Sequence, residues 1–170
     1  MKAFKLKTLV FAAALVGSAS AMAGSATATM TNTTTIPTVC SISAQGFTNN
    51  YDPVVANTTT AVKDATASVT YTCTNGGTGA LISLSGGNND TGTSDAPARH
   101  LTGAEFHDLL AYNLYSDTNY QTVWGYGAAD TVSAIEDGAA HTATVYTQIP
   151  AGQNFHADTY SDTVTATITF

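Results

Sequence analysis

The sequence predicts an all-β protein built as an antiparallel β-sandwich. Short segments of alternating apolar and polar residues recur along the chain, and clusters of glycine, asparagine, aspartate and proline separate them. Threonine dominates the polar faces, and its branched side chain suits a pleated strand far better than a helix. Helical periodicity is confined to one turn at most, within 103–110. A chain of 170 residues without a long repeat is large enough for one sandwich core.

The first 23 residues have the features of a secretory signal peptide. Three lysines form a basic start, and the apolar stretch 9–16 is too short to span a bilayer. The small residues after it allow cleavage before Met22 or, as we prefer, before Gly24. We therefore expect an exported mature chain rather than a membrane-anchored one.

The mature chain is strongly acidic. Three of the five basic residues lie in the predicted signal peptide, so Lys63 and Arg99 stand against twelve acidic residues, a formal charge of −10. Binding to nucleic acid or to anionic lipid needs a basic patch, and this composition excludes one.

The first expected element is a strand at 25–36. Its odd positions are all serine or threonine, and no turn signal folds it back into a hairpin. A strand at a chain terminus exposes unpaired N–H and C=O groups and tends to pair with another sheet edge. Its mostly apolar face consists of Ala26, Ala28, Met30, Asn32, Thr34 and Ile36.

The two cysteines, Cys40 and Cys73, are expected to form a disulfide. An exported protein meets an oxidising compartment, and neither cysteine lies in a C-x-x-C motif or near a plausible histidine base. A loop of this length contributes roughly 3–4 kcal/mol in the chain-entropy model. Free or catalytic thiols are the alternative.

Further strands follow at intervals along the chain. The stretches 86–98 and 49–60 are the most loop-like. Four central segments alternate and end at turn residues: 67–74, 80–85, 109–116 and 142–149.

The last expected strand is 159–170, and its alternating apolar positions include Val164, Ala166, Ile168 and Phe170. No sequence follows Phe170 to form a neighbouring strand. The chain therefore has a strand to spare at one end and lacks one at the other.

No arrangement of residues predicts an enzyme, a metal site or a cofactor. Asp90-Thr91-Gly92 matches the tripeptide of aspartic proteases, but those enzymes need two carboxylates in one site, so a turn explains this single copy better. No G-x-S-x-G motif is present. None of the histidines has ligand spacing to another: His100, His107, His141 and His156.

Aromatic residues cluster between 112 and 126. Such side chains can line a carbohydrate platform, but on strands they more often pack in the core or across strands. The cluster consists of Tyr112, Tyr115, Tyr120, Trp124 and Tyr126.

Two segments and the cysteine placement resemble the spore coat protein U domain family. The first is Tyr112-Asn113-Leu114-Tyr115-Ser116-Asp117 with Val123-Trp124-Gly125, and the second is the closing segment 160–170. The resemblance covers nearly the whole mature chain. The best-understood members of this family are subunits of archaic (sigma-class) chaperone–usher pili of Gram-negative bacteria.

The resemblance implies an incomplete immunoglobulin-like β-sandwich that lacks its final strand. A periplasmic chaperone supplies that strand first, and the N-terminal strand of the next subunit replaces it at the outer-membrane usher. On this chain the donor strand is 24–37, with the alternating residues from Ala26 to Ile36, and the domain is 38–170. The flank of the acceptor groove is Val164, Ala166, Ile168 and Phe170.

This donor face departs from the family pattern, because only Met30 and Ile36 are bulky and apolar. Their burial contributes roughly 1.5–3 kcal/mol each, and the small residues contribute much less. Asn32 in the groove needs a polar partner.

We therefore expect a structural subunit of a surface pilus that supports adhesion and biofilm formation. Its partners are copies of itself or sibling subunits, a periplasmic chaperone and an outer-membrane usher. Two alternatives remain open. One is a secreted coat or matrix protein that completes its own sandwich, and the other is a glycan-binding adhesive module that uses Trp124 and the tyrosines.

Overall fold

The computed structural model describes residues 23–170, so the predicted signal peptide lies, apart from Ala23, outside the described residues. The chain divides into two units, with the boundary between Thr35 and Ile36. Residues 23–35 are extended and exposed, with Met30 at 83% exposure. No strand is assigned there, because a β-ladder needs a second strand and none pairs with it in the described chain. The donor strand stays a prediction.

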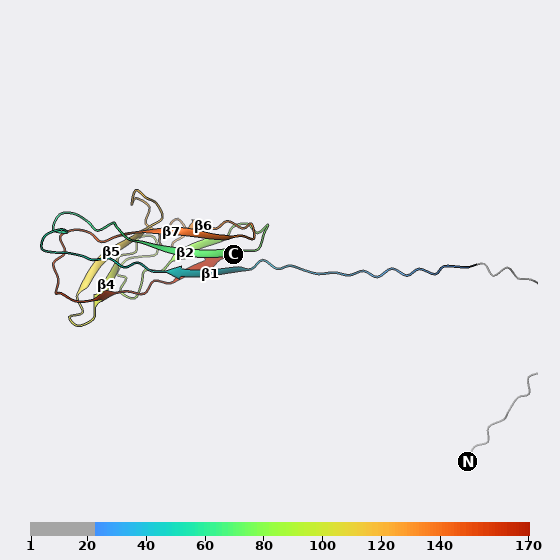
Figure 1. Cartoon of the computed structure of the whole chain (residues 1–170), viewed down its shortest axis with the longest axis horizontal. Coiled ribbons are helices and arrows are strands. Elements are labelled where there is room, and N and C mark those ends of the chain that lie inside the picture. Colours follow the sequence, from blue (N-terminus) through green and yellow to red (C-terminus); the bar gives the residue numbers. More distant parts are fainter. Residues whose placement is uncertain (1–22) are drawn as a thin grey trace, which may run out of the picture. The chain divides into compact units, whose positions relative to one another are not determined.

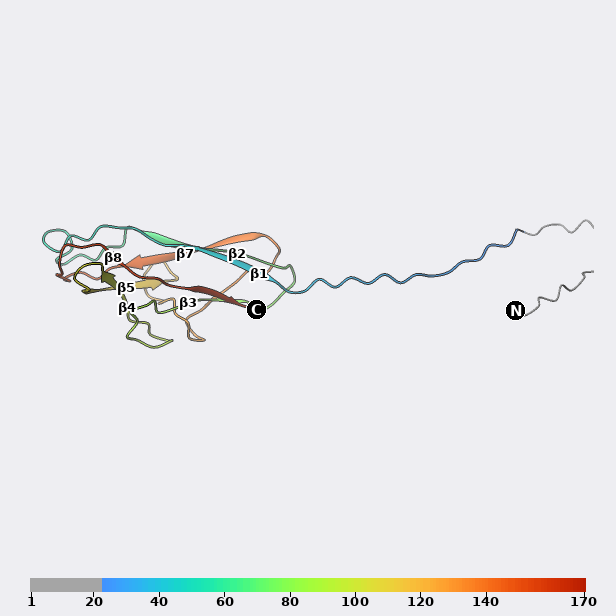
Figure 2. The same cartoon turned by 90° about the horizontal axis from the view of Figure 1, so that it is seen from below.

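The unit from Ile36 onward is all-β, and the described residues contain no helix. A six-stranded and a three-stranded sheet form it, with every pair antiparallel (Figures 1 and 2). The larger sheet has the order β1 (Cys40–Gln45), β2 (Thr66–Cys73), β7 (Ala140–Gln148), β5 (Leu109–Tyr115), β4 (Arg99–Gly103) and β8 (Tyr160–Ser161). The smaller sheet has the order β6 (Val132–Ser133), β3 (Leu81–Leu84) and β9 (Ala166–Thr169).

The four central strands predicted from the sequence are confirmed as β2, β3, β5 and β7. The predicted loops 49–60 and 86–98 contain no strand of either sheet. The short strands β1, β4 and β6 complete the sheets. Across residues 23–170, no helix is long and apolar enough to cross a membrane.

The prediction of one continuous strand over 159–170 is wrong. The chain pairs with β4 as β8, leaves the larger sheet, and then pairs with β3 as β9 in the smaller one. Side-chain and backbone bonds hold this crossing. The Asp162 carboxylate accepts hydrogen bonds from the Tyr112 hydroxyl (2.6 Å) and the Asn88 amide (2.8 Å). The Ser85 amide donates to the Thr165 carbonyl at 2.9 Å.

Both sheets contribute apolar side chains to one core. The side chain of Trp124 is 1% exposed, and its indole N–H donates to the Ile82 carbonyl at 2.9 Å. This bond satisfies the one polar atom of the largest buried side chain. Other core residues are Val69, Tyr71, Leu84, Leu101, Leu110, Tyr112, Leu114, Val145 and Ile149.

A buried arginine connects the loops beside β3 to the core by hydrogen bonds. Arg99 is 1% exposed, and its guanidinium donates to the carbonyl oxygens of Leu84 (2.9 Å), Ser85 (2.8 and 3.0 Å) and Trp124 (2.8 Å). Burial lowers the pKa of Arg99, while the hydroxyl of Tyr112 and nearby carboxylates oppose that shift. One cation thus satisfies three buried carbonyl groups.

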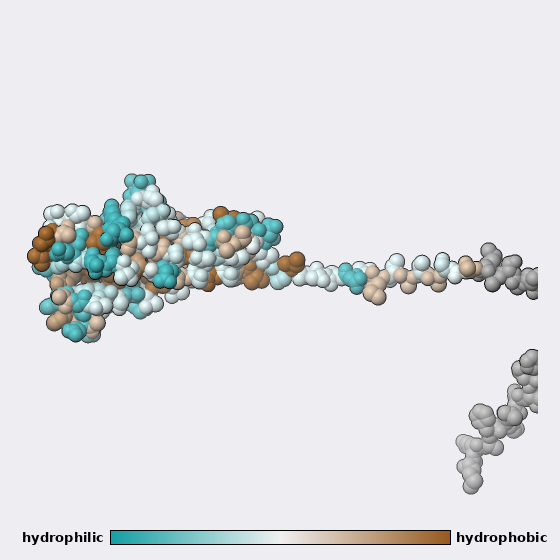
Figure 3. Space-filling view, viewed as in Figure 1, coloured by the Kyte–Doolittle hydropathy of each residue, from teal (hydrophilic) through white to brown (hydrophobic). Residues whose placement is uncertain are grey.

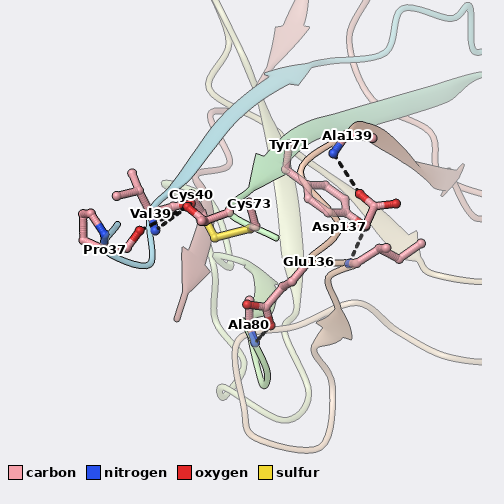
Figure 4. Close-up of a disulfide and its surroundings, with 11 residues drawn as sticks. Pro37, Val39, Cys40, Tyr71, Cys73, Ala80, Glu136, Asp137 and Ala139 are labelled. Carbon is pink, nitrogen blue, oxygen red and sulfur yellow. Dashed lines mark hydrogen bonds between the residues drawn. A yellow bond between two sulfur atoms is a disulfide. The ribbon is translucent and has the colours of Figure 1, made fainter. Parts of the chain in front are cut away.

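The predicted disulfide between Cys40 and Cys73 is confirmed (Figure 4). The two cysteines are directly opposite in the register of β1 and β2, so the bond links neighbouring strands. Thr74, the next residue of the chain, extends this contact. Its amide donates to the Val39 carbonyl at 2.9 Å, and its hydroxyl donates to the Pro37 carbonyl at 3.3 Å. Residues 37–39 therefore continue the line of β1.

Candidate strand-binding groove

A groove of about 1110 Å³ opens into the sandwich between two stretches of chain. Residues 44–51 and the following Pro53 and Val54 form one wall, and 153–164 with Ala166 form the other. Buried side chains from five strands form its floor: Val69, Leu84, Leu101, Leu110, Tyr112, Leu114 and Val145. The floor is the hydrophobic core itself, so a ligand in this groove would pack against the centre of the domain.

The groove lies beyond the ends of two strands that each have an unpaired edge. β1 pairs only with β2, and β9 pairs only with β3, among the described residues. β1 and β9 approach within 8 Å between Cα atoms. That separation is too small for a further strand between them, because neighbouring strands are about 4.8 Å apart. The lining begins at Ala44 and Ala166, so the groove is open beyond the ends of these strands.

The flank predicted from the sequence is half-buried. Val164, Ala166 and Ile168 pack against the core and remain partly exposed, and Phe170 is 57% exposed. Val164 and Ala166 line the groove. Partly covered apolar side chains on a free edge are what one additional strand would bury.

Four aromatic residues in the groove were missed by sequence reasoning: Phe47, Tyr51, Phe155 and Tyr160. The ring of Phe47 lies 5.8 Å from that of Tyr112. Phe47 and Tyr51 belong to stretches without strand alternation. Large aromatic residues in such a segment are a sequence signal, because a solvated loop has no need of them.

Polar side chains line much of both walls, and several of those next to the floor are hydrogen-bonded within the domain. The Tyr112 hydroxyl donates to Asp162, and burial, followed by this hydrogen bond, raises the pKa of Tyr112. The Tyr51 hydroxyl donates to the Pro150 carbonyl (3.1 Å) and accepts from the Gln153 amide (2.9 Å). Asn49 differs from these groups, because its side-chain nitrogen is buried and has no partner among residues 23–170.

A well-ordered loop forms one rim of the groove. The carboxylate of Asp52 accepts hydrogen bonds from the amides of Val54 (2.9 Å), Val55 (3.0 Å) and Ala56 (3.3 Å). The bond from Val55, the strongest cause, and the other two lower the pKa of Asp52. Val54 and Val55 are 77% and 76% exposed. On the face of the molecule shown in Figure 3, hydrophobic residues are scattered among residues of intermediate or hydrophilic character.

The other predicted site residues lie apart from one another. The six predicted donor residues from Ala26 to Ile36 are all exposed. Asp90 accepts from the amides of Gly92 (2.9 Å) and Ala98 (2.8 Å), which confirms its role in a turn. Trp124 is buried and cannot contribute to a surface platform.

The histidines do not converge on one site. His141 pairs with Asp137 (2.8 Å) and His156 with Asp108 (2.7 Å), while His100 and His107 contact backbone carbonyls. Within residues 23–170, no three potential metal-ligating side chains come together.

Comparison with known proteins gives consistent results. Over 167 residues the chain is 38% identical to "Protein U" of Myxococcus xanthus, covering 94% of this chain and 93% of the relative. It is also similar to a solved structure titled as the CsuC-CsuE chaperone-tip adhesion subunit pre-assembly complex from archaic chaperone-usher Csu pili of Acinetobacter baumannii. That match has a TM-score of 0.52 and 22% identity, and it covers 80% of this chain and 41% of the other, so it supports the fold alone. The family model described as Spore Coat Protein U domain matches residues 26–167, and the chain belongs to this family.

Proposed function

We propose that this chain is a structural subunit of a surface pilus that polymerises by strand addition. The N-terminal segment of one copy enters the groove of the next copy and pairs with its free strand edges. One observation carries the proposal: beyond the ends of β1 and β9, each of which has an unpaired edge, a groove opens into the core. The exposed alternating segment from Ala26 to Ile36 supplies a strand of matching chemistry.

The contacts available to the inserted strand account for tight association. Met30 and Ile36 are 83% and 78% exposed, and burying them contributes roughly 1.5–3 kcal/mol each. Each backbone hydrogen bond along a ladder adds about 0.5–1.5 kcal/mol net. Because the donor strand buries few large apolar side chains, the hydrogen-bond ladder supplies a large share of the stability of the association.

A strand donor and a strand acceptor on different surfaces of one chain produce an open linear polymer. The groove also needs protection before assembly, because its apolar floor is accessible. This need supports a periplasmic chaperone as a partner. The proposal further includes assembly at an outer-membrane usher and a cell-surface location with a role in adhesion and biofilm formation.

A self-completed coat protein is the second candidate, favoured by the name of the family and by the full-length match to Protein U. Its own segment would then have to turn back into its own groove. The hydrogen bonds of Thr74 hold Pro37 and Val39 in line with β1 and oppose such a reversal. Pilus assembly therefore agrees better with these contacts.

Unboiled SDS gels of the full exported chain test the proposal. We expect a ladder of multimers that collapses on boiling, and its loss when residues 24–36 are deleted. Met30→Asp should weaken the ladder, whereas the matched Thr29→Asp on the opposite face should weaken it much less. A ladder that survives the deletion contradicts the proposal. A stable monomer with an intact segment supports self-completion instead.

A further inference from the structure

Two polar residues, Asn32 and Thr34, interrupt the apolar face that the proposed polymer would bury, and only Asn32 has a side-chain amide. Asn32 lies between Met30 and Ile36 on the same face of the segment. A slip of one residue would exchange this face for one composed of serine and threonine, which has no large apolar side chain. The even face must therefore enter the groove, and the amide of Asn32 enters with it. An unpaired buried amide costs about 1–3 kcal/mol.

The groove wall has one buried side-chain nitrogen without a hydrogen-bond partner among the described residues. Asn49 lies in its wall between Phe47 and Tyr51, and its side-chain nitrogen has no hydrogen-bond partner within residues 23–170. Asn57, a nearby buried asparagine, differs in this respect. Its oxygen accepts from the Asp52 amide at 2.8 Å, and its nitrogen donates to the Thr60 carbonyl at 2.9 Å.

The direction of the inserted strand brings Asn32 to the inner part of the groove. At the β1 start, residues 37–39 of the receiving copy are already bonded to Thr74. The inserted strand of the donor copy is therefore connected to its own domain at the other, open end of the groove. In this orientation it runs antiparallel to β9 of the receiving copy. Asn32 then lies four residues, about 13 Å of strand, inside Ile36.

Resting on the proposed function, we infer that Asn32 of one copy pairs with Asn49 of the next and sets the register of the polymer. Each amide has a donor and an acceptor, so the two side chains can bond reciprocally. Two other polar groups of the groove, Tyr112 and Asp162, are already bonded to each other at 2.6 Å. A single buried amide pair that fixes register is a device known from coiled coils.

This pairing gives the groove a preference among donor strands. A segment with an apolar residue at the Asn32 position would leave the Asn49 nitrogen unpaired, which is unfavourable however well the rest of the strand packs. The preferred occupant is therefore a second copy of this chain.

A double-mutant cycle on the full exported chain tests the pairing. The variants are Asn32→Leu, Asn49→Leu and the two combined, with Asn119→Leu on an exposed loop as the matched control. The measurement is the rate at which the unboiled ladder collapses to monomer at a fixed temperature. We expect each single change to raise that rate about tenfold. The double change, which removes both polar partners, should return it to within about threefold of the unsubstituted protein.

Additive effects of the two changes, or no effect of Asn32→Leu, overturn the pairing. If Asn49→Leu does not fold, Asn49→Ala removes the amide without added bulk and enters the same cycle with the same expected coupling. Asn32 lies in the exposed segment, so its change leaves the domain of its own copy intact. Absence of the ladder in the unsubstituted protein refutes the proposed function. A normal ladder without coupling refutes the pairing alone.

Discussion

The hydroxyl of Tyr112 donates a 2.6 Å hydrogen bond to Oδ2 of Asp162 and so joins the middle of β5 to the crossing between β8 and β9. The other carboxylate oxygen of Asp162 accepts from the amides of Asn88 and Thr163, both at 2.8 Å. One carboxylate therefore fixes the point at which the chain changes sheets, and with it the wall of the groove.

Tyr112→Phe should destabilise the domain by about 1.5–3 kcal/mol, because it removes a buried hydrogen bond to a charged acceptor. Urea unfolding measures the change in the free energy of unfolding. Tyr126→Phe is the matched control, since its hydroxyl donates to Asp90 at 3.1 Å on the surface. Equal losses in the two variants would contradict the role of the Asp162 bond.

Alkaline pH should weaken the fold through Tyr112. Burial, then the bond to Asp162, raises its pKa above the ordinary 10.0, so the unfolded chain loses this proton first. The contribution is fully present below pH 10 and declines as the pH rises above it. Unfolding free energies measured between pH 9 and about 11.5 should fall less steeply for Tyr112→Phe than for the unsubstituted protein. Equal slopes of the unfolding free energy against pH for the two proteins would contradict a contribution from Tyr112.

Acid should weaken the turn at residues 117–122. The amides of Thr122 (2.6 Å), Asn119 (2.8 Å) and Gln121 (3.1 Å) donate to Asp117 and lower its pKa below 3.8. This contribution is present above pH 3.8 and is lost as the pH falls through the lowered value. Asp117→Asn should flatten the pH dependence of unfolding in this window. Thr118→Ala, which changes an exposed side chain of the same turn, is the control and should leave the dependence unchanged.

Arg99→Met should destabilise the domain by at least about 3 kcal/mol, because three carbonyl groups would lose their common donor. Lys63→Met provides the control. Its ammonium lies 4.3 Å from the ring of Tyr120 on the surface, and its loss should cost less than about 1 kcal/mol. Chemical denaturation of both variants measures the difference, and similar values would contradict the role given to Arg99.

Reduction of the bond between Cys40 and Cys73 should destabilise the domain by roughly 3–4 kcal/mol, given their separation of 33 residues. The Cys40→Ser/Cys73→Ser variant in urea measures this loss without a reductant. Reductant added to that variant should have no further effect. An unchanged unfolding midpoint after complete reduction of the native protein would contradict the expected contribution.

The parts of this fold that the sequence reveals are those that depend on local alternation. β2, β5 and β7 each have a clear two-residue period, and the two cysteines of an exported chain point to their bond. The break after β8 was not predictable in this way, because it depends on Asp162 meeting Tyr112, fifty positions away in sequence.

The groove, too, could be predicted from the sequence only in part. Its floor combines residues from five strands, and its two walls come from segments that are far apart in the sequence. Sequence reasoning identified Val164 and Ala166 on its wall. It missed Phe47 and Tyr51, because they lie outside any alternating segment.

The scarcity of basic residues has a consequence for durability outside the cell. Trypsin-like proteases cut after lysine or arginine, and after the predicted signal peptide the chain has only Lys63 and Arg99. Arg99 is 1% exposed and begins β4, so its peptide bond is inaccessible in the folded domain. A fibre of this chain would present such an enzyme with a single exposed cleavage site per copy, next to Lys63.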